Sequence, residues 1–356
     1  MPNNLQALRA RVGGAVEVFG AALSYPRPPL ISPERAVVVG GTGGIGGAVA
    51  RALAAAGVGV VVTGRAEASC RRTEGALAGD VRCVAGDLSR AEAARALARE
   101  ALTAAAADGG CLCALVLSAG ASPERFEPAA GRAGLGSDVV QQRSEAFSVM
   151  VAGQLLVLEE QFRAGGAGMP WCAAPEPAAA GPYARVVFVG SGADAFATPT
   201  GVRDLFDGHA YDSAGMRAAR SLDDLFGVGA FQAYAAAKHV QELVAAEVGR
   251  RVAASPVGRS VRVVSVSPAG SVRTPTSSIA QAWVDDLPAE ARVLTFGEAG
   301  QAAAPVAKAA LGTGGAAEGG AAAPRCADVA IARRAADAAG ADLDTIAKGS
   351  SVRCPP

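Results

Sequence analysis

The stretch Ala36-Val37-Val38-Val39-Gly40-Gly41-Thr42-Gly43-Gly44-Ile45-Gly46 decides the fold of this 356-residue chain. A β-branched run reaches Val39, glycines follow at once, and a helical pattern begins at Gly44. A strand that ends in glycines and opens a helix places bare backbone N–H groups, and the positive end of a helix dipole, where a pyrophosphate can approach. The stretch therefore predicts a nucleotide-binding turn rather than merely a tight turn.

Short apolar runs and helix-like segments alternate on the C-terminal side of this stretch. We expect strands over residues 36–39, 58–63, 81–85, 112–117, 186–189 and 261–266, and helices over 44–56, 66–77, 89–107, 144–163 and 233–252. Near-continuous apolar strands are typical of a parallel sheet that is buried on both faces. The predicted fold class is α/β, a single Rossmann-type doubly wound parallel sheet with helices on both faces.

Three segments interrupt this rhythm. Residues 164–184 and 192–229 flank the fifth strand, and 312–323 is nearly all Gly and Ala. Loops of such length in a compact domain are usually functional or disordered. The predicted division has three parts: an N-terminal extension (1–34), a nucleotide-binding domain (35–311), and a flexible link with a last helix over 327–339 (312–356). The domain contains a long insertion before the helix that carries Tyr234.

The N-terminal extension has an apolar stripe at three- and four-residue steps, from Leu5 to Leu23. Arg9 and Arg11 precede the first acid, Glu17. Two interpretations stay open: a helix packed on the domain, or a basic amphipathic segment that targets the protein to an organelle.

Composition excludes several functional classes. The 33 basic and 33 acidic side chains balance, so no basic field is present to hold nucleic acid. Seven scattered cysteines and two histidines indicate neither a disulfide framework nor a metal site. No apolar run approaches the roughly 20 residues of a transmembrane helix. We therefore expect a soluble protein in a reducing compartment, cytoplasmic or, through residues 1–34, in a plastid or mitochondrion.

Tyr234-Ala235-Ala236-Ala237-Lys238 carries the clearest chemical signal. The spacing places a phenol and an ammonium on one helix face, within reach of one ligand. A nearby ammonium favours phenolate, so we expect Lys238 to lower the pKa of Tyr234 toward a value suited to general acid/base catalysis. Lysine is scarce, since only Lys238, Lys308 and Lys348 stand beside 30 arginines.

With its G-x-x-x-G-x-G spacing at Gly40, Gly44 and Gly46, the chain resembles the short-chain dehydrogenase/reductase family from about residue 36 to 311. The resemblance implies that Ser191, Tyr234 and Lys238 are catalytic, with Ser191 orienting the substrate oxygen and Lys238 also holding the nicotinamide ribose. It also implies cofactor contacts at Gly40, Thr42, Gly43, Gly44, Ile45, Gly46, Asp87, Leu88, Ala119, Gly120, Tyr234, Lys238, Pro268, Gly270, Val272 and Thr274.

The second strand indicates which nicotinamide cofactor is used. Where NAD-preferring members of this family carry an acid on the ribose, this chain has Gly64 and then Arg65. A missing acid and a guanidinium suit the 2′-phosphate of NADP, so NADP is favoured over NAD.

Three departures from the family pattern matter. The catalytic Asn of the fourth helix is replaced by Met150, which removes the residue thought to hold a water for proton relay. Ser191 and Tyr234 are 43 residues apart, and the usual final strand is missing. The long insertion and the helix after Gly297 are similar to the retinol-dehydrogenase-like and protochlorophyllide-reductase-like branches.

These features predict an NADP(H)-dependent oxidoreductase that moves hydride between nicotinamide and a carbonyl or alcohol carbon of a lipophilic small molecule. Two alternatives are a protochlorophyllide-type C=C reductase and an NADP(H)-binding sensor or scaffold with little turnover. The resemblance also implies a homo-oligomer. Apolar residues of the insertion would either form a lid over the substrate or pack its own core; they are Phe196, Leu205, Phe206, Tyr211 and Leu225.

Overall fold

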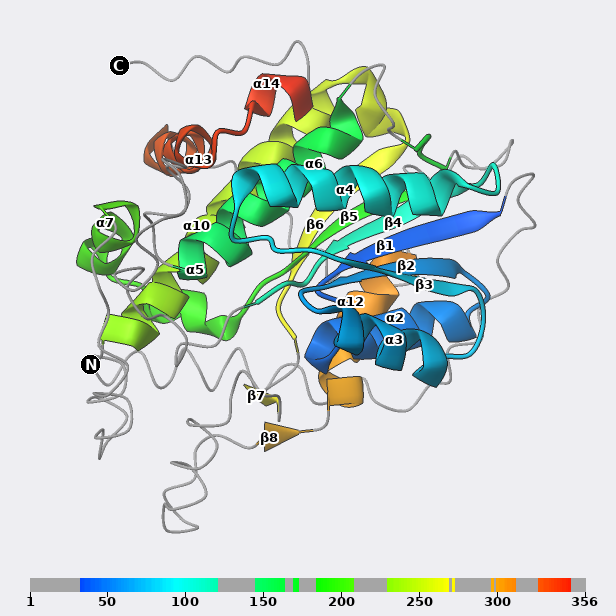
Figure 1. Cartoon of the computed structure of the whole chain (residues 1–356). Helices are drawn as coiled ribbons and strands as arrows, with labels where there is room; N and C mark the ends of the chain where they lie inside the picture. Colours follow the sequence, from blue (N-terminus) through cyan, green and yellow to red (C-terminus); the bar gives the residue numbers. More distant parts are fainter. Residues whose placement is uncertain are drawn as a thin grey trace.

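A computed structural model describes nine parts of the chain, and Figure 1 shows their arrangement. They are residues 33–120, 145–163, 169–172, 184–207, 229–268, 271–272, 296–297, 299–311 and 326–346. The predicted N-terminal extension up to residue 32 and the Gly/Ala link over 312–325 lie outside the described residues. The predicted domain boundaries therefore stay predictions.

The centre of the molecule is a sheet of six parallel strands in the order β3-β2-β1-β4-β5-β6. The strands are β1 (Glu34–Val39), β2 (Gly59–Gly64), β3 (Val81–Ala85), β4 (Cys111–Leu117), β5 (Ala184–Val189) and β6 (Val261–Val266). Val37 lies opposite Val61 of β2 and Leu115 of β4 in the registers of β1 with its two neighbours. The strand order reverses between β1 and β4, as in a doubly wound sheet, which confirms the predicted fold class.

Helices cover both faces of the sheet (Figure 1). One face carries α2 (Gly44–Ala55), α3 (Glu67–Ala76) and α12 (Ala299–Leu311). The other carries α4 (Ala91–Ala106), α5 (Glu145–Phe147), a π-helical turn η5 (Ser148–Ala152), α6 (Gly153–Phe162) and α10 (Gly229–Ala254). On that side α13 (Cys326–Ala339) packs on α10, and α14 (Leu343–Ile346) packs on α6. Within the described residues, β6 is the last strand of the main sheet along the chain.

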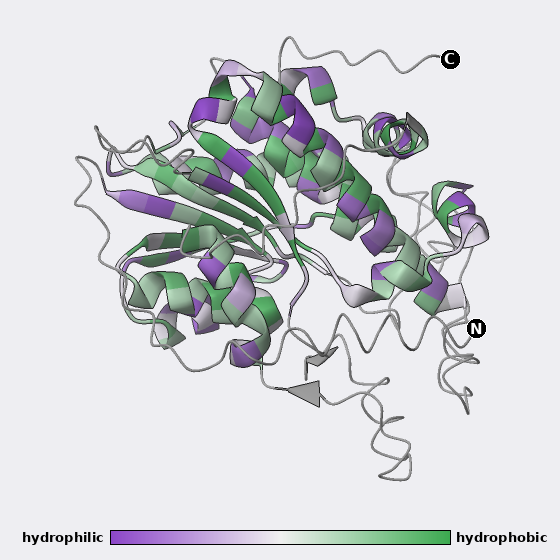
Figure 2. Cartoon of the chain, turned by 180° about the vertical axis from the view of Figure 1, so that it is seen from behind, coloured by the Kyte–Doolittle hydropathy of each residue, from purple (hydrophilic) through white to green (hydrophobic). Residues whose placement is uncertain are grey.

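Alternate strand residues divide the core between the two faces. In β1, Val37 and Val39 join the cluster under α4, α6 and α10, whereas Ala36 and Val38 join the cluster under α2 and α12. All four are fully buried. Figure 2 shows mainly hydrophobic strands between helices that contain both hydrophilic and hydrophobic residues. Burial on both faces explains why the strands appear in the sequence as continuous apolar runs.

The insertion after β5 contains a 3₁₀ turn η6 (Gly192–Phe196) and a helix α7 (Pro199–Asp207). Leu205 and Phe206 of α7 are buried in the core cluster of the α10 face. The Phe206 ring contacts Phe147 with 5.7 Å between centroids, and the Arg334 guanidinium lies 4.5 Å from its centre. Leu205 and Phe206 therefore pack in the core of the domain, rather than in a core that the insertion forms by itself. Tyr211 and Leu225 lie outside the described residues.

Two short strands, β7 (Ser271–Val272) and β8 (Phe296–Gly297), pair in parallel outside the main sheet. Another short element, the 3₁₀ turn η7 (Pro256–Arg259), leads from α10 into β6.

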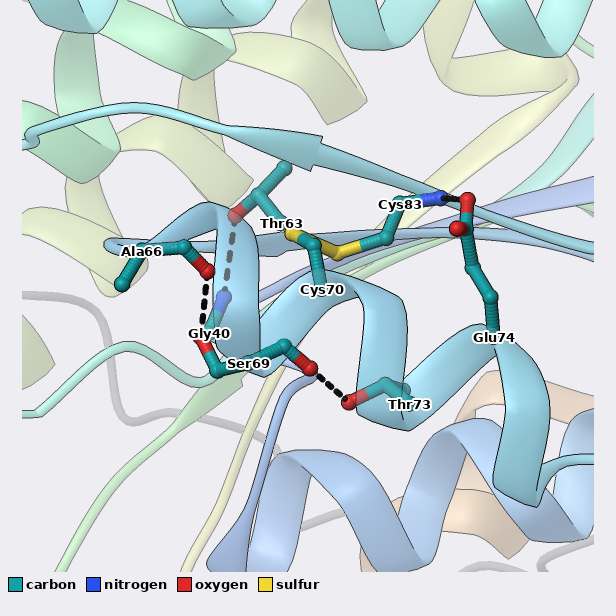
Figure 3. The surroundings of a disulfide bond; sticks show 8 residues. All are labelled: Gly40, Thr63, Ala66, Ser69, Cys70, Thr73, Glu74 and Cys83. Carbon is teal, nitrogen blue, oxygen red and sulfur yellow. Dashed lines mark hydrogen bonds between the residues drawn. A yellow bond between two sulfur atoms is a disulfide. The ribbon is translucent and has the colours of Figure 1, made fainter.

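Four of the cysteines form two disulfides, Cys70–Cys83 and Cys111–Cys172, so the prediction of no disulfide framework is wrong. Figure 3 shows the first, which joins α3 to β3 beside a hydrogen bond from the Cys83 amide to Glu74 (2.7 Å). The second joins β4 to a short segment that adds a bridge to Leu112 through Trp171. Sequence separations of 13 and 61 residues gave no sign of these pairings, because only the parallel packing brings the partners together. The inference of a reducing compartment therefore loses its basis.

Within the described parts of the chain, every helix is either too short or too polar to cross a bilayer.

Candidate active site

The predicted site residues gather at the carboxyl ends of β1, β4 and β5. In an open α/β sheet, ligands bind in the crevice where the strand order reverses, here between β1 and β4. The glycine loop follows β1, Ala119 follows β4, and Ser191 follows β5. The topology therefore brings the predicted cofactor and catalytic groups to one edge.

Glycines of the first loop are required by close packing. Gly40 has φ +80°, and a Cβ there would lie 2.6 Å from the Ala119 Cα. A Cβ at Gly46 would overlap with the Gly40 carbonyl oxygen. By contrast, a Cβ at Gly43 would meet nothing within 4 Å, and no side chain caps the first turn of α2. The loop thus leaves open space in front of the N–H groups of α2, which fits a pyrophosphate.

The second strand holds the loop in place. The Gly40 amide donates to Thr63 Oγ1 (3.1 Å) and the Gly41 amide to the Thr63 carbonyl (2.9 Å). At the end of β2, a Cβ on Gly64 would overlap with the Thr42 side chain. This packing explains why no acid stands at position 64. Arg65 follows on the exposed turn before α3.

Asp87 and Leu88 lie on the turn after β3. The Asp87 carboxylate accepts a hydrogen bond from the Ser89 amide (2.9 Å), so it organises this turn. Leu88 is buried in the core, and its carbonyl lies where a side chain at Gly153 would stand. Leu88 can therefore offer a nucleotide little beyond its backbone.

Some of the remaining predicted cofactor contacts belong to the described residues, and others lie outside them. Ala119 is buried against the glycine loop, and Gly120 after it has open space at its Cα. Pro268 follows β6 and is half-buried, and the backbone of Val272 lies in β7. Gly270 and Thr274 lie outside the described residues.

Ser191 and Tyr234 come together although 43 residues separate them. Ser191 precedes η6, and its Oγ accepts from the Ala193 amide (3.3 Å). Burial raises the pKa of Tyr234, and a hydrogen bond with Ser191 acts in the opposite direction. A hydroxyl that lowers a phenol pKa does so by donating to the phenolate. The pair therefore offers one proton donor and one orienting hydroxyl.

Lys238 is buried one helical turn after Tyr234, with 4% of its surface exposed. Its ammonium donates to the Val189 carbonyl (2.7 Å) and to Gln241 Oε1 (2.9 Å). Burial lowers its pKa from 10.5 to about 8, and the charge of Glu242 opposes this shift. The ammonium contacts these acceptors, and the pKa of Tyr234 is raised rather than lowered. The predicted lowering of the Tyr234 pKa by Lys238 is therefore wrong for this arrangement.

Met150 occupies the position of the family's catalytic Asn. Its side chain is fully buried in the core, and it lies in the π-helical turn η5 that interrupts the helix predicted over 144–163. Single π-turns inside α-helices frequently mark functional sites, and this one precedes Gln154. A polar group thus stands one turn beyond the position where the resemblance leads one to expect it.

Sequence reasoning missed Gln154 and Gln241, each with 1% of its surface exposed. Gln241 Nε2 donates to Gln154 Oε1 (2.7 Å), and Gln154 Nε2 donates to the Ala119 carbonyl (2.6 Å). Part of this could have been found in the sequence, because Tyr234, Lys238 and Gln241 follow the i, i+4, i+7 spacing of one helix face. Contact with Gln154, 87 residues away, required the fold.

Comparison with known proteins supports the resemblance for part of the chain. Residues 34–151 match the family model described as short chain dehydrogenase. Comparison with curated proteins gives no match.

Three solved structures each share 22% sequence identity with this chain. A dehydrogenase/reductase from Sinorhizobium meliloti 1021 is similar over 80% of this chain and 90% of its own, with a TM-score of 0.49. A variant of the Serratia marcescens short-chain dehydrogenase/reductase is similar over 80% of this chain and 93% of its own, also with a TM-score of 0.49. A short chain dehydrogenase/reductase family protein is similar over 79% of this chain and 90% of its own, with a TM-score of 0.47. Family-model support for the short-chain dehydrogenase resemblance thus runs from β1 into the π-helical turn and ends before Ser191, Tyr234 and Lys238.

Proposed function

We propose that this protein is an NADP(H)-dependent oxidoreductase of the short-chain dehydrogenase/reductase type, acting between a carbonyl and an alcohol. One observation carries the proposal: the hydrogen-bonded Ser191 and Tyr234 lie on the same sheet edge as a glycine loop with an open, uncapped helix start. A sensor of the cofactor needs the glycine loop but has no use for a proton donor held by a second hydroxyl.

The residues divide the work as follows. The nicotinamide cofactor, when bound, supplies or accepts the hydride. Tyr234 Oη gives a proton to the substrate oxygen in reduction and takes it back in oxidation. Ser191 Oγ donates a hydrogen bond that fixes this oxygen, while the Ala193 amide holds Oγ in place. Lys238 supplies a rotatable donor for the cofactor ribose.

NADP preference rests on the end of β2. Gly64 has no room for a side chain beside Thr42, which removes the acid that would bind a free ribose hydroxyl. Arg65 comes next and suits a 2′-phosphate. Arg65→Ala should weaken NADPH at least tenfold more than NADH. Arg72→Ala, which removes an exposed arginine of α3, is the matched control. Equal losses for both cofactors would remove the case for NADP.

An apolar substrate is favoured by one aromatic pair. Phe196, which ends η6 just after Ser191, contacts Phe231 with 6.2 Å between ring centroids. Phe231 lies three residues before Tyr234 on α10, so it shares a helix face with the phenol. Both rings are half-buried, which makes them an apolar wall beside the proton donor. We expect lipophilic aldehydes or ketones to be preferred over hydrophilic ones.

The decisive experiment is NADPH oxidation over a panel of aldehydes, ketones and quinones, with NADPH affinity measured separately. We expect Tyr234→Phe to abolish turnover and to retain NADPH binding. Ser255→Ala, at the residue that follows the last residue of α10, controls for loss of a hydroxyl near the other end of this helix. Tight NADPH binding without turnover on any substrate would favour the sensor instead, and turnover surviving in Tyr234→Phe would remove the phenol from the mechanism.

A further inference from the structure

A buried network of two amide side chains connects Lys238 to the floor of the glycine loop. Hydrogen bonds run from Lys238 Nζ to Gln241 Oε1 (2.9 Å), from Gln241 Nε2 to Gln154 Oε1 (2.7 Å) and from Gln154 Nε2 to the Ala119 carbonyl (2.6 Å). We call these three bonds the amide network. They link α10 to α6 and α6 to the end of β4.

The direction of every bond in the amide network is fixed by its two ends. An ammonium can only donate and a backbone carbonyl can only accept. Gln241 must therefore turn its oxygen to Lys238 and its nitrogen to Gln154. Turning either amide around would place two donors against each other and two acceptors against each other in a buried site, where unsatisfied polar groups are costly. One arrangement satisfies all four groups.

The amide network also ties the predicted proton site to the predicted cofactor site. Ala119 packs against the glycine loop so closely that a Cβ at Gly40 would lie 2.8 Å from its amide nitrogen. At the other end, the second bond of Lys238 goes to the Val189 carbonyl at the end of β5 (2.7 Å). The ammonium is therefore held at a fixed place between the ends of β4 and β5.

We propose that Gln241 and Gln154 are positioning residues that hold the Lys238 ammonium at the catalytic edge of the sheet. Gln241 does so directly, and Gln154 does so by fixing the orientation of the Gln241 amide. The resemblance leads one to expect an Asn at position 150, but this chain has the buried Met150 there. Gln154, in the helix that follows, is instead linked to Lys238 through Gln241. The catalytic consequence rests on the proposed function, whereas the position and charge of Lys238 do not.

The charged surroundings of Lys238 are simple enough to test this. Glu242 on α10 acts on it by its charge, and Glu242 itself accepts a hydrogen bond from Ser265 Oγ (2.7 Å). Tyr234 lies one turn before it, β5 contributes the Val189 carbonyl, and Gln154 of α6 is linked to it only through Gln241. A change at Gln241 should therefore appear directly in the protonation of Lys238.

Scarcity of lysine makes the measurement direct. With three lysines in the sequence, selective ¹³C labelling of lysine gives three side-chain signals in NMR spectra, and the signal lost in Lys238→Met assigns Lys238. The pH titration of that signal is followed in the wild type, Gln241→Leu, Gln241→Glu and Gln154→Leu. Gln161→Leu is the matched control, since Gln161 is a buried glutamine of the same helix α6 that donates to the Met169 carbonyl instead (2.7 Å).

We expect opposite shifts from the two changes at Gln241. Gln241→Leu removes an acceptor of the ammonium and should lower the titration midpoint by about one pH unit, whereas Gln241→Glu places a carboxylate there and should raise it by about as much. Gln154→Leu should lower it by a smaller amount, and Gln161→Leu should leave it in place. A purely structural role would reduce stability in the Leu variants and move no midpoint. If Gln241→Leu fails to fold, the titration midpoints of Lys238 in Gln241→Glu and Gln154→Leu decide whether the two glutamines position the ammonium.

Turnover gives the second readout. Gln241→Leu should lower kcat about tenfold or more while NADPH binding stays within a few-fold, and Gln241→Glu should shift the pH dependence of kcat upward. A wild-type enzyme without turnover would refute the proposed function and leave the titration as the test of the network. Unchanged Lys238 titration in Gln241→Leu and Gln241→Glu, or an equal shift in Gln161→Leu, would overturn the network itself.

Discussion

Replacing Lys238 by Met should change how the free energy of unfolding depends on pH. The ammonium is buried, and burial lowers its pKa from 10.5 to about 8. Below pH 8 Lys238 is charged in both the folded and unfolded states, so its burial is fully unfavourable there. Between pH 8 and 10.5 the folded protein releases the proton first, while the unfolded chain still binds it. Stability contributed by Lys238 therefore rises with pH in this window and is lost as pH falls through it.

The magnitude follows from the two pKa values. A difference of one pKa unit corresponds to about 1.4 kcal/mol, so the wild type should gain about 2–3 kcal/mol relative to Lys238→Met between pH 7 and pH 10. The comparison cancels all groups that titrate alike in both proteins, including Tyr234. It is also independent of the constant penalty that Lys238→Met incurs by leaving the Val189 carbonyl and the Gln241 amide without their partner.

Urea unfolding followed by circular dichroism, at half-unit steps from pH 7 to 10, measures this difference. Lys308→Met is the control, because it removes a lysine from α12 on the opposite face of the sheet. Curves for the wild type and Lys238→Met that run parallel over the whole range would refute the reasoning, since they would mean that Lys238 keeps the same proton affinity in the folded and unfolded states.

Three further predictions test a disulfide at the amino end of β4 and the packing around the site. Replacing both Cys111 and Cys172 by Ser should lower the free energy of unfolding by about 4 kcal/mol, because the 61-residue separation makes the closed loop long, and an unchanged urea midpoint would contradict the pairing. Met150→Asn, although it restores the family residue, should cost about 2–4 kcal/mol and add no turnover, since position 150 is fully buried in the core; a higher kcat at unchanged stability would show that this side chain reaches the site. Gly64→Asp should weaken NADH and NADPH alike, as measured by fluorescence titration, because any side chain there overlaps with Thr42; a switch to NADH would contradict that packing.

The sequence was sufficient for most of the sheet. Strands buried on both faces are continuous apolar runs, so all six predicted strands overlap those observed, and the glycine loop identified where β1 ends. Helix α7 and the π-helical turn were not predicted. Phe206 shows why, since it packs against the distant residues Phe147 and Arg334, and the sequence around it did not distinguish a lid from a core helix.

For the candidate site, the sequence identified residues whose role follows from their own chemistry, such as Tyr234 and Lys238. It missed those whose role comes from tertiary contact. Gln154 looks like an ordinary polar residue in a helix, and only its 2.7 Å contact with Gln241 gives it meaning. The expectation that Lys238 lowers the pKa of Tyr234 failed for a related reason, because helical spacing indicates proximity but not which acceptors an ammonium chooses.

The same contacts explain why this arginine-rich chain keeps a lysine at position 238. Arginine forms ion pairs elsewhere in the described residues, as in Arg95 with Glu159 (2.8 Å) and Arg251 with Asp344 (2.6 Å), where a planar guanidinium meets a carboxylate. At position 238 the partners are a backbone carbonyl and an amide oxygen, both neutral. A guanidinium stays charged at every working pH and needs acceptors for five N–H groups, whereas an ammonium needs three and can release its proton when burial makes the charge costly. Arg at this position would leave donors unsatisfied in the core and would keep a permanent charge buried there. The lysine is therefore required by the buried site itself, and a substitution to Arg should be tolerated less well than one to Met.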